Sequence, residues 1–153
     1  MRGKSHPHFA LMMKQQKYFR SYIPPMILAV STLCIYLTTM APGLTWANDG
    51  VDGGDLITAA ATGGVPHPTG YPAYLLIARL FQMIPLGSLA YRTNLLSALA
   101  TVLAALFIYF LVIRSLSPTE SASEWKAGLL AGYAYSFSPI VWSQAVITEV
   151  YSL

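Results

Sequence analysis

The composition of the chain excludes most classes of soluble protein. Of the 153 residues, 55% are hydrophobic and 10% are charged, whereas a soluble domain carries roughly a quarter charged residues. The formal net charge is +3, but the basic residues are placed as the cytoplasmic flank of a membrane span rather than as a nucleic-acid-binding surface. The residues that precede the first apolar run, with no acid among them, are Arg2, Lys4, Lys14, Lys17 and Arg20. We therefore predict an all-α integral membrane protein and no nucleic-acid partner.

The first apolar run covers residues 23–40 and is about the minimum length of a transmembrane helix. Pro24 and Pro25 fall at its start, where a missing N–H costs little, so we expect the span to begin there. Residues 1–22 are then a cytoplasmic basic tail, either a short helix on the membrane surface or an unstructured segment. A signal peptide cleaved near Ala47 is the alternative interpretation, but the length of the run and the further apolar segments favour an uncleaved anchor.

Residues 41–92 form the expected outer loop. Residues 51–64 combine acids, helix-forming residues and a terminal Gly-Gly pair, which predicts a short helix after a loop. Three prolines then fix a tight turn at residues 66–72. Residues 73–84 have an amphipathic pattern that is too short and too polar to span a bilayer. We expect this segment to be a helix that lies along the membrane interface.

Two further spans are predicted, at residues 93–113 and 127–146. The first is the clearest apolar run and is closed by a basic residue. The second contains small residues that allow close helix contact, and Pro139 is expected to kink it. This topology places the N-terminus in the cytoplasm and gathers the acids of the outer loop and Glu149 on the opposite face. Because three spans enclose little, we expect the N-terminal part of a larger multi-pass protein.

The outer loop contains two acids at helical spacing, Asp52 and Asp55. If a helix begins at or before Asp52, both carboxylates point to one face, and one of them can act as a general base. The alternative interpretation is capping of the helix N-terminus, which acids favour in any case. A divalent cation at the pair stays open, since oxygen sites need ligands beyond two aspartates. No second His or Cys lies nearby to make a zinc site.

Five more residues are candidates for substrate binding. His67 can bind a sugar hydroxyl or a phosphate, or it can hold a neighbouring carbonyl. Tyr71 can stack on a sugar or lie at the membrane interface. Arg79 and Arg92 suit a phosphate, or they contact phospholipid headgroups. Glu149 lies at the mouth of a span, where acids usually have a role, unless it is simply a solvated helix end.

The combined motifs resemble one family. The segment from Pro42 onward reads PGLTWANDGVDGGDLITAAATGGVPHPTGYPAYLLIARLF and is followed by RTNLLSAL and WSQAVITEVYSL. It is similar to the N-terminus of a GT-C-type membrane glycosyltransferase family, formerly labelled a domain of unknown function and related to an animal transmembrane protein O-mannosyltransferase. The combination of GDLITAA, HPTGYP and EVYSL is much more specific than an acidic pair alone.

The resemblance implies a GT-C-like fold with interfacial helices in the first outer loop. It also implies inverting transfer of a sugar from a polyprenyl-phosphate carrier to a hydroxyl of a protein or glycan. Within the family an acid of the first outer loop is the base, which corresponds here to Asp52 or Asp55. His67 and Tyr71 match the turn motif, and Glu149 matches an acid of the third helix. Relatives imply a bacterial inner membrane.

Two other functions fit the same spans. A transporter or channel segment would place its acids within the bilayer, along a pathway. Here the acids lie in the outer loop, which favours the glycosyltransferase. An inactive membrane scaffold would keep the fold without turnover, and the sequence leaves that alternative open.

Overall fold

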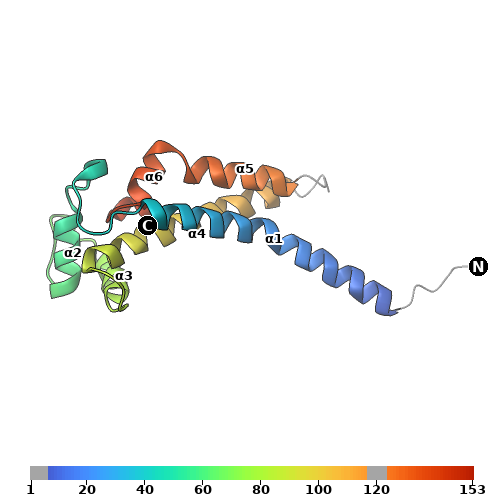
Figure 1. Ribbon diagram of the computed structural model, residues 1–153, viewed down its shortest axis with the longest axis horizontal. Coiled ribbons are helices and arrows are strands. Elements are labelled where there is room, and N and C mark those ends of the chain that lie inside the picture. Colours follow the sequence, from blue (N-terminus) through green and yellow to red (C-terminus); the bar gives the residue numbers. More distant parts are fainter. Residues whose placement is uncertain (1–6, 117–123) are drawn as a thin grey trace, which may run out of the picture.

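The computed structural model describes residues 7–116 and 124–153, with side-chain contacts described from residue 22 onward. Within these ranges every regular element is helical, which confirms the all-α prediction for the described part. The elements are α1 (Pro7–Thr39), η1 (Ala47–Asp49), α2 (Gly53–Thr62), α3 (Pro72–Gln82), α4 (Leu89–Leu116), α5 (Glu124–Ser136), α6 (Pro139–Ala145) and η3 (Val150–Ser152). The long helices α1, α4 and α5 run lengthwise beside one another, and α2 and α3 lie together at one end (Figure 1).

Two helices of the described part are long and apolar enough to cross a membrane. These segments are Tyr22–Thr39 of α1 and the whole of α4, with mean hydropathies of 1.5 and 2.6. Only 28% and 39% of their most apolar windows are buried inside the protein. A core helix of a soluble protein would be mostly covered, whereas these helices leave large apolar side chains such as Phe107 and Leu103 exposed. We therefore describe the chain as a membrane protein.

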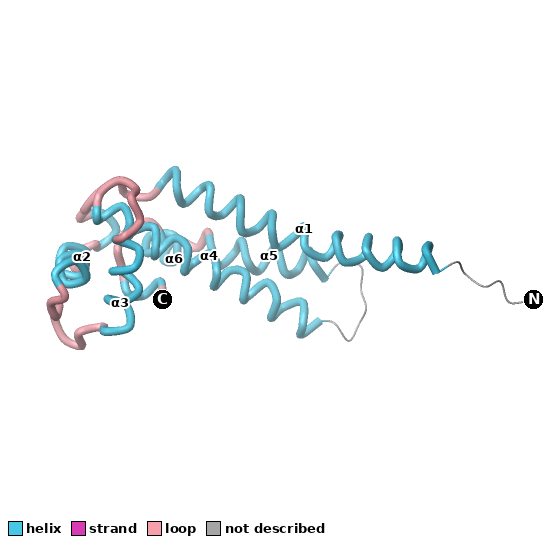
Figure 2. The backbone as a smooth tube through the Cα atoms, turned by 90° about the horizontal axis from the view of Figure 1, so that it is seen from below, coloured by secondary structure: helices cyan, strands magenta, loops and turns pink. Residues whose placement is uncertain are grey.

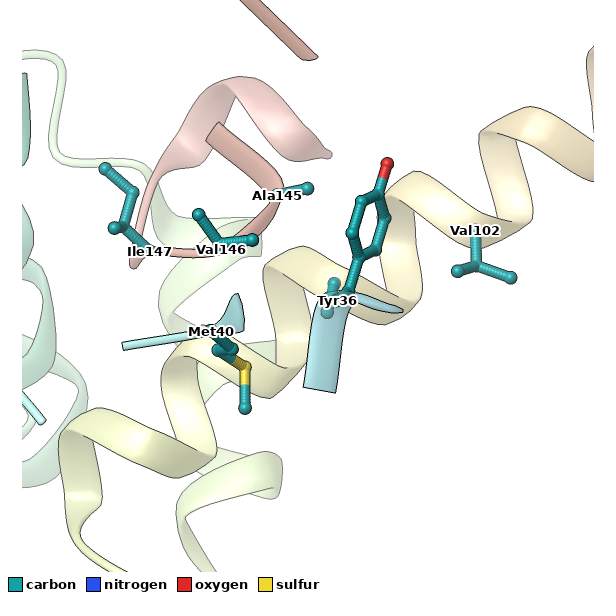
Figure 3. Packing of buried hydrophobic residues seen from close by; sticks show 7 residues of the cluster. Tyr36, Met40, Val102, Ala145, Val146 and Ile147 are labelled. Carbon is teal, nitrogen blue, oxygen red and sulfur yellow. The ribbon is translucent and has the colours of Figure 1, made fainter. Parts of the chain in front are cut away.

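Helix α4 is the centre of the fold, because it packs against α1, α2, α3, α5 and α6. The tube view shows the bundle of α1, α4 and α5 continuing into the end formed by α2, α3 and α6 (Figure 2). At that junction Tyr36 of α1 and Met40, just after the end of α1, meet Val102 of α4 and the segment from Ala145 to Ile147 (Figure 3). The Tyr36 hydroxyl donates a hydrogen bond of 2.7 Å to the carbonyl of Ser136. This cluster fixes the chain that follows α6 against the bundle.

Small residues allow α5 to approach its neighbours closely, as the sequence indicated. A Cβ atom at Gly128 would lie 2.8 Å from the ring of Tyr109, and one at Gly132 would lie 2.5 Å from Leu28. Tyr109 and Leu28 are both fully buried. Helix contact in membranes depends on such close packing, since apolar side chains gain little from leaving lipid.

The apolar segment Tyr22–Thr39 nearly coincides with the first predicted span at residues 23–40, but the helix that contains it begins earlier than expected. Helix α1 begins at Pro7, and both Pro24 and Pro25 lie inside it. The part of the basic tail after residue 6 is therefore helical and continuous with the first span, rather than a separate surface helix or an unstructured segment. Proline lacks a backbone donor but keeps a helical φ, so a long apolar helix can continue through the pair. The prediction for residues 1–6 lies outside the described residues.

The third predicted span is not one helix. Helix α5 ends at Ser136, and the short α6 begins at Pro139, with Ser138 in an extended conformation between them. Proline disfavours a helical conformation in the residue before it, so the expected kink is a full break. Alone, α5 is about 20 Å long at 1.5 Å per residue, which is short for a span.

Candidate functional site

The motif GDLITAA forms helix α2, which presents both predicted aspartates at its start. Asp52 occupies the N-cap position and Asp55 lies in the first turn, but Asp52 makes no side-chain capping bond. The helix ends at Gly63, where the N–H groups of Gly63 and Gly64 bond the carbonyl of Ala59 at 2.9 and 3.1 Å. The predicted stop is confirmed, and the capping role predicted as the alternative for Asp52 is not realised.

Asp55 is bound twice by the residue that the proline turn presents. Its Oδ2 atom accepts a bond of 2.9 Å from the backbone N–H of His67 and lies 2.9 Å from the His67 ring atom Nδ1. Because a carboxylate only accepts, the Nδ1 atom carries the proton of this bond. These bonds hold the pKa of Asp55 below its usual range, first through the backbone N–H. The same pair raises the pKa of His67, mainly through its side-chain bond to Asp55.

Asp52 faces the other nitrogen of the same ring. Its Oδ2 atom lies 3.5 Å from Nε2 of His67, and the two side chains are 42% and 36% exposed. This distance is longer than an ordinary N–H···O bond. Both aspartates therefore reach one histidine, a contact that the i, i+3 spacing did not predict, but only Asp55 makes short hydrogen bonds to it. The Asp52 carboxylate keeps the capacity to accept a proton from another group.

Glu149 interacts electrostatically with Asp52 and His67 of this cluster and is 4% exposed. Burial raises its pKa, and the negative charge of Asp52 raises it further. Among the described residues its Oε2 atom has no hydrogen-bond partner. Glu149 is therefore a buried acid, not the solvated helix end that the sequence left as its alternative.

Tyr74 carries a second buried oxygen without a hydrogen-bond partner, and the charge of Glu149 acts on it. The ring is 5% exposed, and its hydroxyl has no hydrogen-bond partner in the described part. Burial raises the pKa of this hydroxyl, and the charge of Glu149 adds to the effect. A buried unpaired polar atom costs free energy and calls for an explanation. Glu149 and Tyr74 therefore provide two buried oxygen atoms that could form hydrogen bonds with a polar ligand.

The turn motif HPTGYP holds His67 through its backbone. Gly70 has φ +83, which favours glycine, and Tyr71 has φ +41, which is uncommon for a residue with a side chain. Tyr71 precedes Pro72 at the first position of α3. Its ring contacts the His67 ring edge-on, with centroids 5.5 Å apart. The tyrosine thus supports the histidine, and whether it also touches a sugar stays a prediction.

The structure does not bring the two arginines into ion pairs with these acids. The Arg92 guanidinium donates to the carbonyls of Gln82, Leu86 and Gly87 at 2.7, 2.8 and 3.1 Å. It therefore holds the turn that follows α3, which leaves the predicted phosphate contact without support. Arg79 is exposed, and its Nη1 atom lies next to Gly63 at the far end of α2. Its role as a substrate-binding residue stays a prediction.

A network of polar side chains holds the segment that carries Glu149 against α4. The sequence analysis did not predict this network. Asn94 of α4 donates to the carbonyls of Ala41 and Gly43 at 2.8 and 3.3 Å, and Thr148 donates to its Oδ1 atom at 2.5 Å. The Ser97 hydroxyl lies 3.4 Å from the backbone N of Glu149. Polar residues at i, i+3 and i+7 in an otherwise apolar span (Asn94, Ser97, Thr101) were the available signal. The motifs RTNLLSAL and TEVYSL therefore pack on one another.

No group of three or more potential ligands in the described part has the arrangement of a metal site. The two aspartates contact different nitrogens of the same histidine ring, and Glu149 is buried. The site offers a carboxylate 3.5 Å from the histidine ring, an acid–histidine pair held by short bonds, and a buried acid whose charge acts on a buried hydroxyl. Such a set can accept a proton and bind hydroxyl groups.

Comparisons with known proteins cover the same region. Residues 52–153 match the family model described as the protein O-mannosyl-transferase TMEM260 N-terminal domain. The chain is 43% identical over 105 residues to protein O-mannosyl-transferase TMEM260 of Mus musculus, across 68% of this chain and 14% of the mouse protein. It is 32% identical over 130 residues to protein O-mannosyl-transferase tmem260 of Dictyostelium discoideum, across 83% of this chain and 15% of that protein.

No solved structure matches the chain. The chain spans about a seventh of the length of the two relatives. The family model begins at Asp52 and includes Asp55, His67 and Glu149, which are the residues that the fold brings together. Because this model covers well over half of the sequence, the chain belongs to the family of the TMEM260 N-terminal domain.

Proposed function

We propose that the chain is the N-terminal part of a membrane glycosyltransferase with a GT-C-like architecture. The enzyme would transfer a sugar, mannose by analogy with the names of the relatives, from a polyprenyl-phosphate carrier to a hydroxyl of a protein or glycan. The reaction would take place on the extracytoplasmic face of a bacterial inner membrane, with the N-terminus in the cytoplasm. The observation that carries the proposal is the uncommitted Asp52 carboxylate beside the Asp55–His67 pair.

The geometry divides the roles of the two aspartates. In an inverting displacement the acceptor oxygen bonds to the anomeric carbon, its proton passes to a base, and the lipid phosphate leaves with the electrons of the broken C–O bond. Asp55 is the poorer base, because two bonds from His67 stabilise its ionised form. Asp52 is therefore the base in our proposal, with Asp55 as the residue that positions His67.

The departing phosphate requires positive charge or donors. Arg79 is the candidate for this role among the described outer residues, since the donors of Arg92 bond carbonyls. The roles given to Asp52 and Asp55 do not depend on a divalent cation, and no group of three or more potential metal ligands lies together in the described residues.

A transporter segment is the second candidate function, and the position of the acids counts against it. Asp52 and Asp55 lie at the start of α2, outside both candidate spans. Acids that define a transport pathway would be expected within the bilayer.

The test is transfer of a labelled sugar from a prenyl-phosphate donor by the full-length protein in membranes. Asp52→Asn should lower the rate by roughly 10²- to 10⁴-fold, the usual contribution of a general base. Asp49→Asn is the matched control, because residue 49 has φ +59, a conformation that asparagine also adopts readily. Normal transfer by Asp52→Asn would exclude Asp52 as the base.

A further inference from the structure

Helices α2 and α3, with the turn between them, lie at one end of the molecule and are tied together by side-chain bonds (Figure 1). Asp55 of α2 binds the backbone N–H and the ring of His67 in the turn. Gln82, the last residue of α3, donates a bond of 3.0 Å from Nε2 to the carbonyl of Ile57 in α2. Because these bonds join α2 both to the turn and to α3, the segment from Gly53 to Gln82 forms one unit, which we call the α2–α3 unit.

The α2–α3 unit is fixed to the rest of the protein where the chain leaves it and where the chain enters it. At the exit, Gln82 Nε2 also donates to the Thr93 hydroxyl of α4 at 3.2 Å, and Arg92 of α4 donates to the carbonyl of Gln82 at 2.7 Å. At the entry, Gly53 is buried, and a Cβ atom there would lie 3.6 Å from the carbonyl oxygen of Thr148. These two attachment points define a line about which the unit can turn.

The turn between the two helices is the free end of the unit. In the part of the chain that the structure describes, residues 63–71 form hydrogen bonds only with residues of the unit itself. The contact between the unit and α4 is apolar here, and it brings Leu56, Tyr74 and Ala78 against Leu96 of α4. Movement of the turn away from α4 therefore separates apolar side chains but breaks no hydrogen bond of the turn.

The closed contact also buries polar atoms that have no partner. Among the described residues these are the Tyr74 hydroxyl, Oε2 of Glu149 and Oε1 of Gln82. Val150, which follows Glu149, packs against the same apolar cluster as Tyr74. A buried polar atom without a partner raises the free energy of the state that buries it. Since segments of low local stability open without unfolding of the whole protein, the closed position of the unit is only weakly favoured.

We propose that the α2–α3 unit is a lid that turns about the line through Gly53 and Gln82, so that its free end swings away from α4 and gives a ligand with hydroxyl groups access to Tyr74 and Glu149. Asp55 and His67 move with the lid. Glu149 stays on α4, because its backbone nitrogen lies 3.4 Å from the Ser97 hydroxyl. The motion therefore changes the spacing between the exposed Asp55–His67 pair and the buried acid, and it does not depend on the chemistry proposed above.

Hydrogen exchange of the full-length protein in phosphatidylcholine nanodiscs tests the lid. Tyr74→Phe removes a buried hydroxyl without a partner, so it should favour the closed position and slow exchange by roughly five- to tenfold in α2 and α3 alike. Exchange in the middle of α4 should not change. Tyr36→Phe is the matched control, since the Tyr36 hydroxyl has a partner in the carbonyl of Ser136 at 2.7 Å. This control should leave exchange in α2 and α3 unchanged.

Unchanged or faster exchange in Tyr74→Phe would overturn the proposal, because the closed contact would then gain nothing from loss of the hydroxyl. Slower exchange in only one of the two helices would also overturn it, because α2 and α3 would not move as one unit.

Distances between spin labels test the direction of the motion. The labels are carried by site-specifically incorporated noncanonical amino acids at exposed positions, so native cysteines do not interfere. Ala61, near the free end of the lid, should show two distances to Leu103 of α4, whereas Leu80, near the attached end, should show one. Ala61 and Leu76 both lie on the lid and should keep a single distance. Tyr74→Phe should reduce the longer Ala61–Leu103 distance by the same factor as it reduces exchange.

A single Ala61–Leu103 distance, or two distances within the lid, would contradict the motion. Both measurements are made without donor or acceptor, so they are independent of the transfer assay. A moving lid in a protein that transfers no sugar would keep this inference and remove the glycosyltransferase. Normal transfer by a protein whose lid has one fixed position would remove the lid and keep the enzyme.

Discussion

The backbone nitrogen and the ring atom Nδ1 of His67 both lie 2.9 Å from the same carboxylate oxygen of Asp55. A single aspartate therefore fixes the position of the turn and the orientation of the ring that the turn carries. This relationship gives Asp55 and Asp52 different environments although they lie three residues apart on one helix.

Asp55→Asn should lower the pKa of His67 toward the ordinary histidine value of about 6.5. The bond to the Asp55 carboxylate is the main cause of the raised pKa, and an amide cannot supply the same negative charge. Chemical-shift titration of a ¹³C-labelled His67 ring measures the change. The control is Asp49→Asn, which should leave the titration unchanged. An unaltered His67 pKa in Asp55→Asn would contradict the assigned contact.

Glu149→Gln should stabilise the protein at neutral pH but not in acid. The folded-state pKa of Glu149 is raised by burial, so the folded state binds this proton more tightly than the unfolded state. Stability is then full below the unfolded-state pKa and is lost as pH rises toward the raised folded-state pKa. The melting temperature of the variant should exceed that of the parent increasingly as pH rises from about 4.5. A constant difference across this window would refute the buried acid.

Gly128→Ala should destabilise the bundle by about 1–3 kcal/mol, the usual cost of overpacking. The new methyl group would lie 2.8 and 2.9 Å from two ring atoms of the fully buried Tyr109. Alanine gains about 1 kcal/mol of helix propensity over glycine, which only partly offsets the clash. Thermal unfolding in detergent measures the result. Gly43→Ala is the control, since a Cβ there meets nothing within 4 Å.

Asn94→Leu should destabilise the end of the molecule that carries the acids. The substitution keeps the side-chain size but leaves the carbonyl of Ala41 and the hydroxyl of Thr148 without their partner. Each buried unsatisfied group costs about 1–3 kcal/mol. Hydrogen exchange should increase at residues 145–150 and stay unchanged in the middle of α5. Equal exchange in the two proteins would show that Asn94 does not hold this segment.

The existence of the helices and the grouping of the acids at one end could be predicted from the sequence, because both depend on local sequence pattern. The spacing of Asp52 and Asp55 and the stop at Gly63 follow from helix geometry alone. The start of α1 was missed because two prolines normally favour a helix boundary, yet tertiary context places them inside. The break at Ser138 was underestimated, since a proline in an apolar run permits either a kink or a stop.

The distinction between the two aspartates was beyond sequence reasoning. It depends on a contact between Asp55 and His67 across 12 residues, which only the folded turn defines. The structural role of Arg92 could not be predicted either, because it also depends on contacts that only the folded chain makes. An arginine near an outer loop suits a phosphate, and only the structure shows its donors on three carbonyls. The burial of Glu149 likewise depends on how the chain after α6 packs against α4.

Helix α4 contacts α1, α2, α3, α5 and α6. One helix therefore connects the membrane-spanning part of the protein to the end that carries the acids. A helix adjusts its tilt to the thickness of the surrounding lipid. Any such adjustment of α4 shifts Ser97 and Asn94, and with them the segment that carries Glu149. The arrangement therefore couples the position of Glu149 to the thickness of the surrounding bilayer.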